Sequence, residues 1–308
     1  MTLPLHVRIY EVGPRDGLQN EARAISTAEK VEYIRLLAAA GLREIEATSF
    51  VSPRAIPQLA DAEDVVRSLR SLTCGKGVRY PVLVPNERGL ARADAVGADA
   101  MAVFTAASDT FTERNIGMSV ARSLEVFAPI LRAARERGWW TRAYVSTAFG
   151  CPYSGRIEPS AVADVSLRLA DLGAQEICLG DTIGVGVPTQ VHELTDRLTA
   201  AGLPVESLAY HFHDTRGTAL ANVMAGLQDG VTCFDSSTGG TGGCPYAPGA
   251  AGNLATEDLV YLLDGLGIEH GVRLEGVLDA ARYISGVLGR PLATKVGQAG
   301  GWAPAGSA

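Results

Sequence analysis

Cysteine is scarce in this sequence, and the few cysteines present do not form a recognisable motif. The 308 residues contain five cysteines, an odd number, and no two of them form a Cys-x-x-Cys pair. This pattern argues against a disulfide framework and favours a reducing compartment. We therefore expect a cytoplasmic protein.

Long hydrophobic runs are also missing. Glycine, proline or charged residues interrupt every apolar stretch before it reaches the roughly 20 residues that a membrane-spanning helix needs. Residues 1–9 are too short for a secretory signal and do not have the character of a transit peptide. These absences predict a protein that does not associate with membranes.

Positive charge is in deficit. The chain has 27 Lys and Arg against 34 Asp and Glu, which gives a formal net charge of −7. This balance argues against broad binding to nucleic acid or to anionic membranes, because both are polyanions. It leaves room for a few basic residues that grip a small anionic substrate.

What the sequence does contain is a repeated alternation of short apolar or β-branched runs with longer helical patterns. Eight such units predict a (β/α)8 TIM barrel with an all-parallel sheet and extra C-terminal helices. The first helix is expected to begin at Ser26 or Thr27, which are both cap candidates, and to end at Gly41. The expected strands are residues 7–12, 44–50, 82–84, 100–105, 142–147, 176–180, 209–215 and 233–237. The expected later helices are residues 61–72, 87–96, 119–137, 159–172, 188–200, 217–228, 253–266 and 274–288.

No interdomain linker interrupts this series. We expect residues 1–298 to form a single catalytic domain that includes the C-terminal helical addition, and residues 299–308 to form a flexible tail rich in small residues.

Polar and ionisable residues gather at the expected C-terminal ends of the strands. In a barrel of this kind the active site lies at those ends, and a barrel without a site would spread such residues more evenly. They are Arg15 and Asp16, then Glu46, Thr48 and Ser49, then Tyr144 and Ser146, then Asp181 and Thr182, and finally His211, His213 and Asp214.

The expected seventh strand carries two of the five histidines. His211 and His213 are two residues apart, so they point to one face of the strand while Phe212 points to the other. With Asp16 they offer two nitrogens and one carboxylate oxygen, a set that holds a divalent cation and leaves positions open for substrate. Asn253 adds a possible fourth ligand. This set suits Mn²⁺ or Co²⁺ better than Mg²⁺, so the identity of the metal depends on its availability.

Each of these residues also has a simpler interpretation. The two histidines of the seventh strand are also compatible with a solvated cleft in which their hydrogen bonds are satisfied without a metal. Asp16 beside Arg15 is compatible with a surface ion pair, and Asn253 with a cap of the helix that follows it.

A glycine-rich segment, residues 239–243, leads directly to Cys244 and Pro245. The sequence gives little support for phosphate binding by this segment, because the P-loop lysine and the dinucleotide fingerprint are both missing. A mobile lid that carries Cys244 over the metal is more plausible, since four glycines permit large dihedral changes. The alternatives are a plain turn with an inert cysteine, or a role for Cys151, which also precedes a proline.

Several stretches together resemble the 3-hydroxy-3-methylglutaryl-CoA lyase family. The resemblance covers residues 7–298 in the expected order, which is more specific than any single motif. It rests on residues 11–20 (EVGPRDGLQN), 46–53 (EATSFVSP), 150–153 (GCPY), 179–186 (LGDTIGVG), the histidine strand, 239–246 and 252–261 (GNLATEDLVY).

The resemblance implies cleavage of 3-hydroxy-3-methylglutaryl-CoA to acetyl-CoA and acetoacetate, a step of leucine degradation. It implies an acyl-CoA substrate, a homodimer, and a divalent cation, Mg²⁺ or Mn²⁺. The family's mitochondrial leader and peroxisomal tail have no counterpart here, which implies a bacterial-type cytoplasmic form. The implied metal ligands are Asp16, His211, His213 and Asn253. The implied catalytic residues are Arg15, Asp16, His211, the lid residue Cys244, and Glu46. The implied substrate contacts are Arg15, Gln19, Asn115, Tyr144, Asp181 and Thr182.

Cleavage of the C2–C3 bond of such a substrate has three requirements. A base must remove the proton of the C3 hydroxyl group, and Asp16 and His211 both remain candidates. A cation must stabilise the enolate at the thioester oxygen, which suits Arg15. A proton donor must then quench the carbanion, which suits Cys244.

Three alternatives stay open. Related lyases act on longer 3-hydroxy-3-alkylglutaryl-CoA esters and share these motifs. Claisen-type condensing enzymes that join acetyl-CoA to a 2-oxo acid share an Arg-Asp motif and the histidine strand, although the missing regulatory domain argues against them. A non-enzymatic scaffold that binds CoA or metal is the third, and the complete ligand set argues against it.

Overall fold

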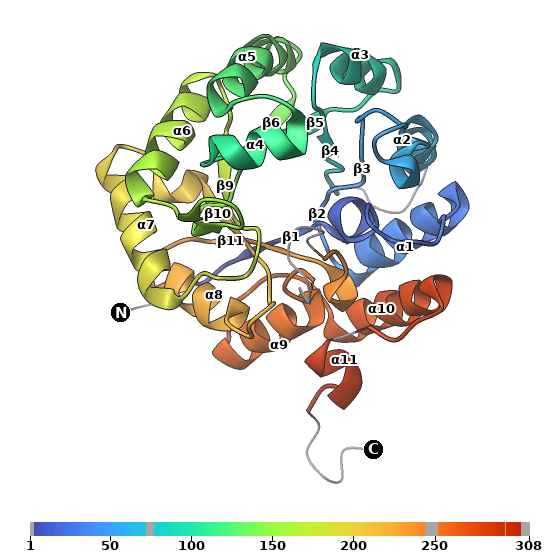
Figure 1. Cartoon of the computed structure of the whole chain (residues 1–308). Helices are drawn as coiled ribbons and strands as arrows, with labels where there is room; N and C mark the ends of the chain where they lie inside the picture. The colour runs from blue at the N-terminus through green and yellow to red at the C-terminus, as the bar shows by residue number, and fades with distance from the viewer. Residues whose placement is uncertain (1–2, 72–76, 244–251, 293, 303–308) are drawn as a thin grey trace.

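The computed structural model describes residues 3–71, 77–243, 252–292 and 294–302 (Figure 1). Its main sheet is parallel throughout and follows the order β2-β1-β11-β10-β9-β6-β5-β4-β3. The strands are β1 (Arg8–Glu11), β2 (Glu44–Ile45), β3 (Thr48–Ser49), β4 (Val82–Leu83), β5 (Ala100–Ala106), β6 (Trp140–Ser146), β9 (Glu176–Asp181), β10 (Leu208–Phe212) and β11 (Cys233–Ser236).

The two ends of this order belong to one extended segment, residues 44–49. The backbone N–H of Glu46 donates to Glu11 O at 2.8 Å, on the β1 side. The backbone N–H of Ala47 donates to Pro81 O at 2.9 Å, on the β4 side. The segment therefore joins β1 to β4 and closes the sheet into a barrel of eight strand positions, which confirms the predicted (β/α)8 fold.

Helices surround this barrel (Figure 1). They also continue beyond the eighth strand, where α10 packs against α1 and α11 against α9. The helices are α1 (Thr27–Ala40), α2 (Ala62–Ser71), α3 (Glu87–Ala95), α4 (Asp109–Ile116), α5 (Val120–Glu136), α6 (Pro159–Asp171), α7 (Pro188–Ala200), α8 (Ala219–Gln228), α9 (Thr256–Leu266), α10 (Leu274–Leu288) and α11 (Lys295–Ala299).

Helix α1 shows how local sequence sets the boundaries of these elements. Ser26 is its N-cap and forms a capping box with Glu29, in which each side chain accepts from the other residue's backbone N–H. Gly41 ends the helix with a φ of 112°, a conformation that favours glycine. The boundaries expected from the sequence are confirmed.

Four details differ from the sequence prediction, and one of them is α11, a helix that was not expected. The expected second strand is divided into β2 and β3. The segment that contains Asn115 lies between the expected strand at 100–105 and the expected helix at 119–137, and no helix was expected there. It forms α4, because Ser108 accepts from the N–H of Phe111 and Gly117 terminates the helix. A short antiparallel hairpin, β7 (Gly150–Cys151) with β8 (Gly155–Arg156), was also not predicted.

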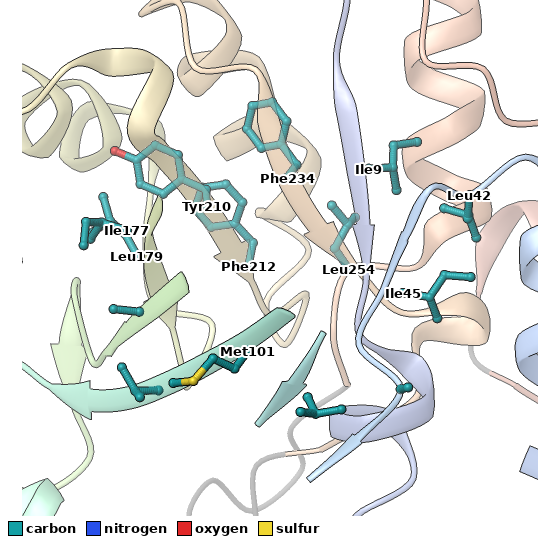
Figure 2. Packing of buried hydrophobic residues seen from close by; sticks show 14 of the residues in the cluster. Ile9, Leu42, Ile45, Met101, Ile177, Leu179, Tyr210, Phe212, Phe234 and Leu254 are labelled. Atoms are coloured by element: carbon teal, nitrogen blue, oxygen red, sulfur yellow. The ribbon is translucent and has the colours of Figure 1, made fainter. Parts of the chain in front are cut away.

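The principal hydrophobic core lies between the strands and the helices. Tyr210 and Phe212 of β10 point into it and stack with ring centroids 5.1 Å apart, near Phe234 of β11 (Figure 2). Burial of these large rings fixes which face of β10 looks outward. The intervening His211 must therefore point into the barrel, as the two-residue spacing predicted.

No helix in the described part of the chain is both long enough and apolar enough to cross a membrane.

Candidate active site

Arg15 and Asp16 lie on a short π-helical turn, Gly13–Gly17, that follows β1. The N–H groups of Asp16 and Gly17 both donate to Val12 O, at 2.7 and 3.2 Å. A Cβ on Gly17 would lie 2.3 Å from Thr241 Oγ1, so only glycine allows the turn to approach the glycine-rich segment this closely. The turn directs the Arg15 and Asp16 side chains toward the mouth of the barrel.

Asp16, His211 and His213 form a compact cluster. One potential ligand atom from each lies within 4.8 Å of those of the other two. His213 follows β10 directly and forms an isolated bridge with Asn253. The Asn253 amide nitrogen donates to Asp16 Oδ2 at 2.8 Å and to Thr241 O at 2.9 Å. The structure thus brings together all four residues that the sequence suggested as metal ligands.

Two of the simpler interpretations are wrong. Helix α9 begins at Thr256 with Ala255 as its N-cap, so Asn253 does not cap it. The side chains of Arg15 and Asp16 are only 8% and 16% exposed, so their ion pair at 2.6 Å is not a surface pair.

The donor set fits a divalent cation. His213 Nδ1 and Asn253 Oδ1 are buried and have no hydrogen-bond partner among the described residues. Buried polar atoms of this kind normally have a partner, and a cation would supply one. Two imidazole nitrogens with carboxylate and amide oxygens are ligands that Mn²⁺, Co²⁺ and Mg²⁺ accept.

The electrostatics of the cluster keep the ligands in their binding forms. Burial tends to raise the pKa of Asp16, but Arg15 and the two histidines outweigh it and lower the pKa to about 2. Burial and the neighbouring His211 lower the pKa of His213 to about 4, although Asp16 opposes this shift. At neutral pH the carboxylate is therefore ionised and the His213 imidazole is neutral, as metal binding requires.

Arg15 is held by a second set of contacts. Its Nε donates to Glu46 Oε2 at 2.6 Å, and its Nη1 donates to Asp16 Oδ1 at 2.6 Å. The Tyr144 hydroxyl donates to the same Glu46 oxygen at 3.2 Å, and the Arg15 guanidinium lies 5.5 Å from the Tyr144 ring centroid. Burial by itself would lower the pKa of Arg15, but the carboxylates of Glu46 and Asp16 raise it, so the guanidinium stays charged.

A cavity of about 620 Å³ opens beside this cluster, a size that suits a small-molecule site. Its wall also includes apolar side chains that the sequence did not single out, among them Leu83 and Phe104. The predicted site residues in its wall are Arg15, Asp16, Gln19, Asn115, Tyr144, Thr182, His211 and His213.

A family model described as HMGL-like matches residues 6–284 of this sequence. The chain belongs to the HMGL-like family. Two curated relatives are similar over nearly their whole length. Hydroxymethylglutaryl-CoA lyase of Pseudomonas mevalonii is 52% identical, covering 95% of this chain and 96% of its own. The mitochondrial hydroxymethylglutaryl-CoA lyase of Bos taurus is 50% identical, covering 97% of this chain and 90% of its own.

Solved structures of hydroxymethylglutaryl-CoA lyases have the same fold as this chain. The HMG-CoA lyase of Bacillus subtilis superposes with a TM-score of 0.93 at 46% identity, covering 97% of this chain and 99% of its own. An HMG-CoA lyase of Acinetobacter baumannii, in complex with coenzyme A and 3-methylmalate, superposes with a TM-score of 0.91 at 36% identity and 97% coverage of both chains.

Two predicted site residues of this HMGL-like chain lie behind the cavity wall. Glu46 is fully buried and reaches the cavity only through Arg15 and Tyr144. Both carboxylate oxygens of Asp181 accept backbone N–H groups, from Val185 and Gly186 at 2.9 Å each. Asp181 therefore shapes the loop after β9 and does not face the cavity.

Cys244 lies outside the described residues. The preceding residue, Gly243, lines the cavity. Cys151, the other candidate cysteine, is a buried residue of the β7–β8 hairpin, and its sulfur accepts from Ser108 Oγ at 3.2 Å. Cys151 is not part of the cavity wall.

Arg142 and Asp235 lie behind His211 and were not among the predicted site residues. Asp235 Oδ2 is 3.0 Å from His211 Nδ1, and Asp235 Oδ1 accepts from Arg142 at 2.5 Å. Both side chains were inside expected strands, but nothing in a single sequence indicates that charged side chains of two strands meet inside the barrel.

Proposed function

We propose that this protein is a carbon–carbon lyase that cleaves 3-hydroxy-3-methylglutaryl-CoA to acetyl-CoA and acetoacetate. The observation that carries the proposal is the cluster of Asp16, His211 and His213, with Arg15 beside it and a cavity in front of it. Relatives that share about half of the sequence over 97% of the chain are hydroxymethylglutaryl-CoA lyases. The coenzyme A complex of the Acinetobacter enzyme supports an acyl-CoA substrate.

The metal of the proposed site is Mg²⁺ or Mn²⁺, held by Asp16, His211, His213 and Asn253. The unpartnered atoms of His213 and Asn253 support this ligand set. When bound, such a cation supplies Lewis-acid chemistry that makes the C3 hydroxyl group of the substrate more acidic.

Arg15 is the proposed catalytic cation. Its charge lies at the cavity wall, where the thioester oxygen of a bound substrate becomes negative as the C2–C3 bond breaks. Glu46 and Tyr144 act through Arg15, because they hold its guanidinium in one orientation before the substrate arrives. Preorganisation of this kind removes the need for reorganisation during the reaction.

Two proton transfers remain. Asp16 and His211 are the candidates for the base that receives the hydroxyl proton. Cys244 is the proposed donor to the carbanion, and the position of Gly243 in the cavity wall supports this role. Gln19, Asn115, Tyr144 and Thr182 are the proposed substrate contacts, and Asp181 contributes by holding the loop that carries Thr182.

Three further properties belong to this proposal. The resemblance to the lyase family supports a homodimer. The bacterial relative, whose name carries no organelle, supports a cytoplasmic location. The hydrogen bonds from Val296 N and Thr294 Oγ1 to Asp258 tie α11 to α9 and support one catalytic unit over residues 1–298, with residues 299–308 as a tail.

Product analysis by mass spectrometry tests the proposal. The purified protein is incubated with Mn²⁺ and 3-hydroxy-3-methylglutaryl-CoA, and in parallel with esters that carry longer 3-alkyl groups. We expect acetyl-CoA and acetoacetate, with the methyl ester turned over fastest. A faster reaction with a longer ester would instead assign the related activity. Release of free CoA from acetyl-CoA and a 2-oxo acid would assign a condensing enzyme, and no turnover of any ester would overturn the lyase proposal.

A further inference from the structure

His211 has one ring nitrogen committed to a buried partner. Its Nδ1 lies 3.0 Å from Asp235 Oδ2, and Asp235 is 1% exposed. An ionised carboxylate only accepts hydrogen bonds, so this contact requires a proton on Nδ1. The neutral ring then has its free lone pair on Nε2, which leaves that nitrogen as the ligand atom for a metal.

Asp235 is itself held by a buried cation. Its Oδ1 accepts from Arg142 Nη2 at 2.5 Å, and Arg142 is fully buried. The Arg142 guanidinium lies 3.8 Å from the ring centroid of Tyr10, and its Nε is 3.2 Å from Glu176 Oε1. Arg142 is therefore fixed by the barrel interior and can only donate to Asp235.

The contact between His211 and Asp235 is built into the strand register. The two residues are paired directly across β10 and β11, and both side chains point into the barrel. Arg142 comes from β6, next to β9, in which Glu176 is its paired neighbour. Strand-borne contacts of this kind hold a ligand more rigidly than contacts from loops.

We propose that Asp235 is a positioning residue of the metal site: it fixes His211 with the proton on Nδ1 and Nε2 free to ligate, and Arg142 holds Asp235 in the orientation that this requires. The proposal rests on the metal-dependent function proposed above. It adds two residues, Asp235 and Arg142, that do not face the cavity. It also leaves Asp16 as the candidate base for the hydroxyl proton, because both ring nitrogens of His211 are then committed.

Asp235→Asn tests the proposal sharply. Arg142 offers only donors, so the amide oxygen of the asparagine would face Arg142 and the amide nitrogen would face His211 Nδ1. A donor at that position favours the opposite tautomer, with the proton on Nε2, which blocks the ligand atom. The matched control is Glu176→Gln, which removes a buried negative charge next to the same arginine but does not touch His211.

The first measurement is the affinity of the metal-stripped full-length protein for Mn²⁺, by titration calorimetry or by the electron paramagnetic resonance signal of free Mn²⁺. We expect Asp235→Asn to weaken Mn²⁺ binding by about 10- to 100-fold. This is the usual loss when a residue that hydrogen-bonds to a metal ligand is replaced. We expect the Glu176→Gln affinity to stay within about threefold of wild type, although both variants lose thermal stability. Circular dichroism verifies that each variant is folded.

The second measurement reads the tautomer of His211 in the wild-type protein and needs a variant only to assign the signal. Long-range ¹H–¹⁵N correlation spectra of the metal-free protein, with His211 assigned by its loss in His211→Gln, report which nitrogen carries the proton. A proton on Nε2, an unchanged Mn²⁺ affinity in Asp235→Asn, or an equal loss in both variants would each overturn the proposal. A wild-type protein that does not bind Mn²⁺ would instead overturn the proposed function, and the spectra would still decide the state of His211. The spectra also decide the proposal if Asp235→Asn does not fold.

Discussion

The role of Arg15 depends on the two carboxylates that surround its guanidinium. Glu46 accepts from its Nε and Asp16 accepts from its Nη1, each at 2.6 Å. The two carboxylates therefore keep the Arg15 guanidinium charged and hold it in one orientation. Stabilisation of an enolate requires both properties.

Arg15→Gln separates catalysis from metal binding. The variant keeps a hydrogen-bond donor but loses the positive charge at the cavity wall, so we expect kcat to fall by about 10²- to 10³-fold. Mn²⁺ affinity should change little, because Arg15 is not a ligand. Steady-state kinetics and a Mn²⁺ titration of the same preparation make the comparison. Arg122→Gln, at an exposed arginine on α5, is the control, and a near-normal rate in Arg15→Gln would remove Arg15 from the mechanism.

We expect opposite effects on kcat from substitution of the two cysteines that precede a proline. Cys244→Ala removes the proposed proton donor, so we expect kcat to fall by about 10²-fold or more. Cys151→Ala removes a buried sulfur that accepts from Ser108 outside the cavity, so it should lower stability slightly and leave kcat close to wild type. Single-turnover kinetics of both variants decide the matter. Equal rates in wild type and Cys244→Ala would make Cys244 inert.

At the scale of secondary-structure elements, one buried carboxylate joins the segments that form the site. Glu11 Oε1 accepts from the backbone N–H groups of Gly13 and Thr238, at 2.8 and 2.9 Å. Glu11 Oε2 accepts from the hydroxyl groups of Thr238 and Thr256, at 2.7 Å each. The side chain thereby links the Arg15–Asp16 turn, the start of the glycine-rich segment and the start of α9.

Substitutions of Glu11 should distinguish shape from charge. Glu11→Ala removes the acceptor that four buried donors share, so we expect the free energy of unfolding to fall by about 3 kcal/mol and kcat to fall with it. Glu11→Gln keeps an oxygen for the two N–H groups, and its amide nitrogen can donate to the two threonine hydroxyls, so most of the stability and activity should remain. Urea denaturation and kinetics test both. A glutamine variant as impaired as the alanine variant would show that the charge itself is required.

The elements predicted from the sequence are those whose signals are local. The alternation of apolar runs and caps such as Ser26 predicted the eight strand positions and the surrounding helices. Helix α4 was missed because its polar residues, Thr112 to Asn115, lack a broad apolar stripe, although Ser108 and Gly117 bracket it. The His211–His213 spacing predicted that both imidazoles point to one face of β10, where the structure places them beside Asp16. The Arg142–Asp235 contact could not be predicted, because it depends on the register of strands far apart in the chain.

At the scale of the whole molecule, a buried carboxyl group in the first turn of α9 contributes to the pH dependence of stability. Glu257 is fully buried, with one oxygen accepting from Gly239 N at 3.0 Å. Burial raises the pKa of Glu257 from the ordinary 4.5 to about 7, although that hydrogen bond opposes the shift. The folded protein therefore holds this proton more tightly than the unfolded chain does.

The raised pKa of Glu257 makes the folded protein less stable as the pH rises. Below pH 4.5 both states are protonated and the group contributes nothing. Between pH 4.5 and about 7 the unfolded chain releases the proton first, so this group lowers the free energy of unfolding as pH rises. We expect Glu257→Gln to exceed wild type in stability by about 3 kcal/mol at pH 8 and to match it closely at pH 4.5. Urea denaturation at several pH values measures the gap, and a gap that does not widen with pH would contradict the pKa shift.

Metal binding should stabilise the whole barrel, because the proposed ligands come from the turn after β1, from the C-terminal end of β10 and from the segment before α9. A ligand present at 100 times its dissociation constant stabilises the folded state by about 2.7 kcal/mol, which corresponds to a rise in Tm of about 4 °C for a chain of this size. We expect chelation to abolish turnover and lower Tm, and Mn²⁺ to restore both. His213→Ala should lose the Mn²⁺-dependent rise in Tm, whereas His192→Ala, at a histidine on α7 that pairs with Asp229, should keep it. Differential scanning calorimetry with and without Mn²⁺ compares the three proteins. An equal rise in Tm for His213→Ala would mean that the stabilising metal binds elsewhere, and the ligand set proposed for this barrel would then be wrong.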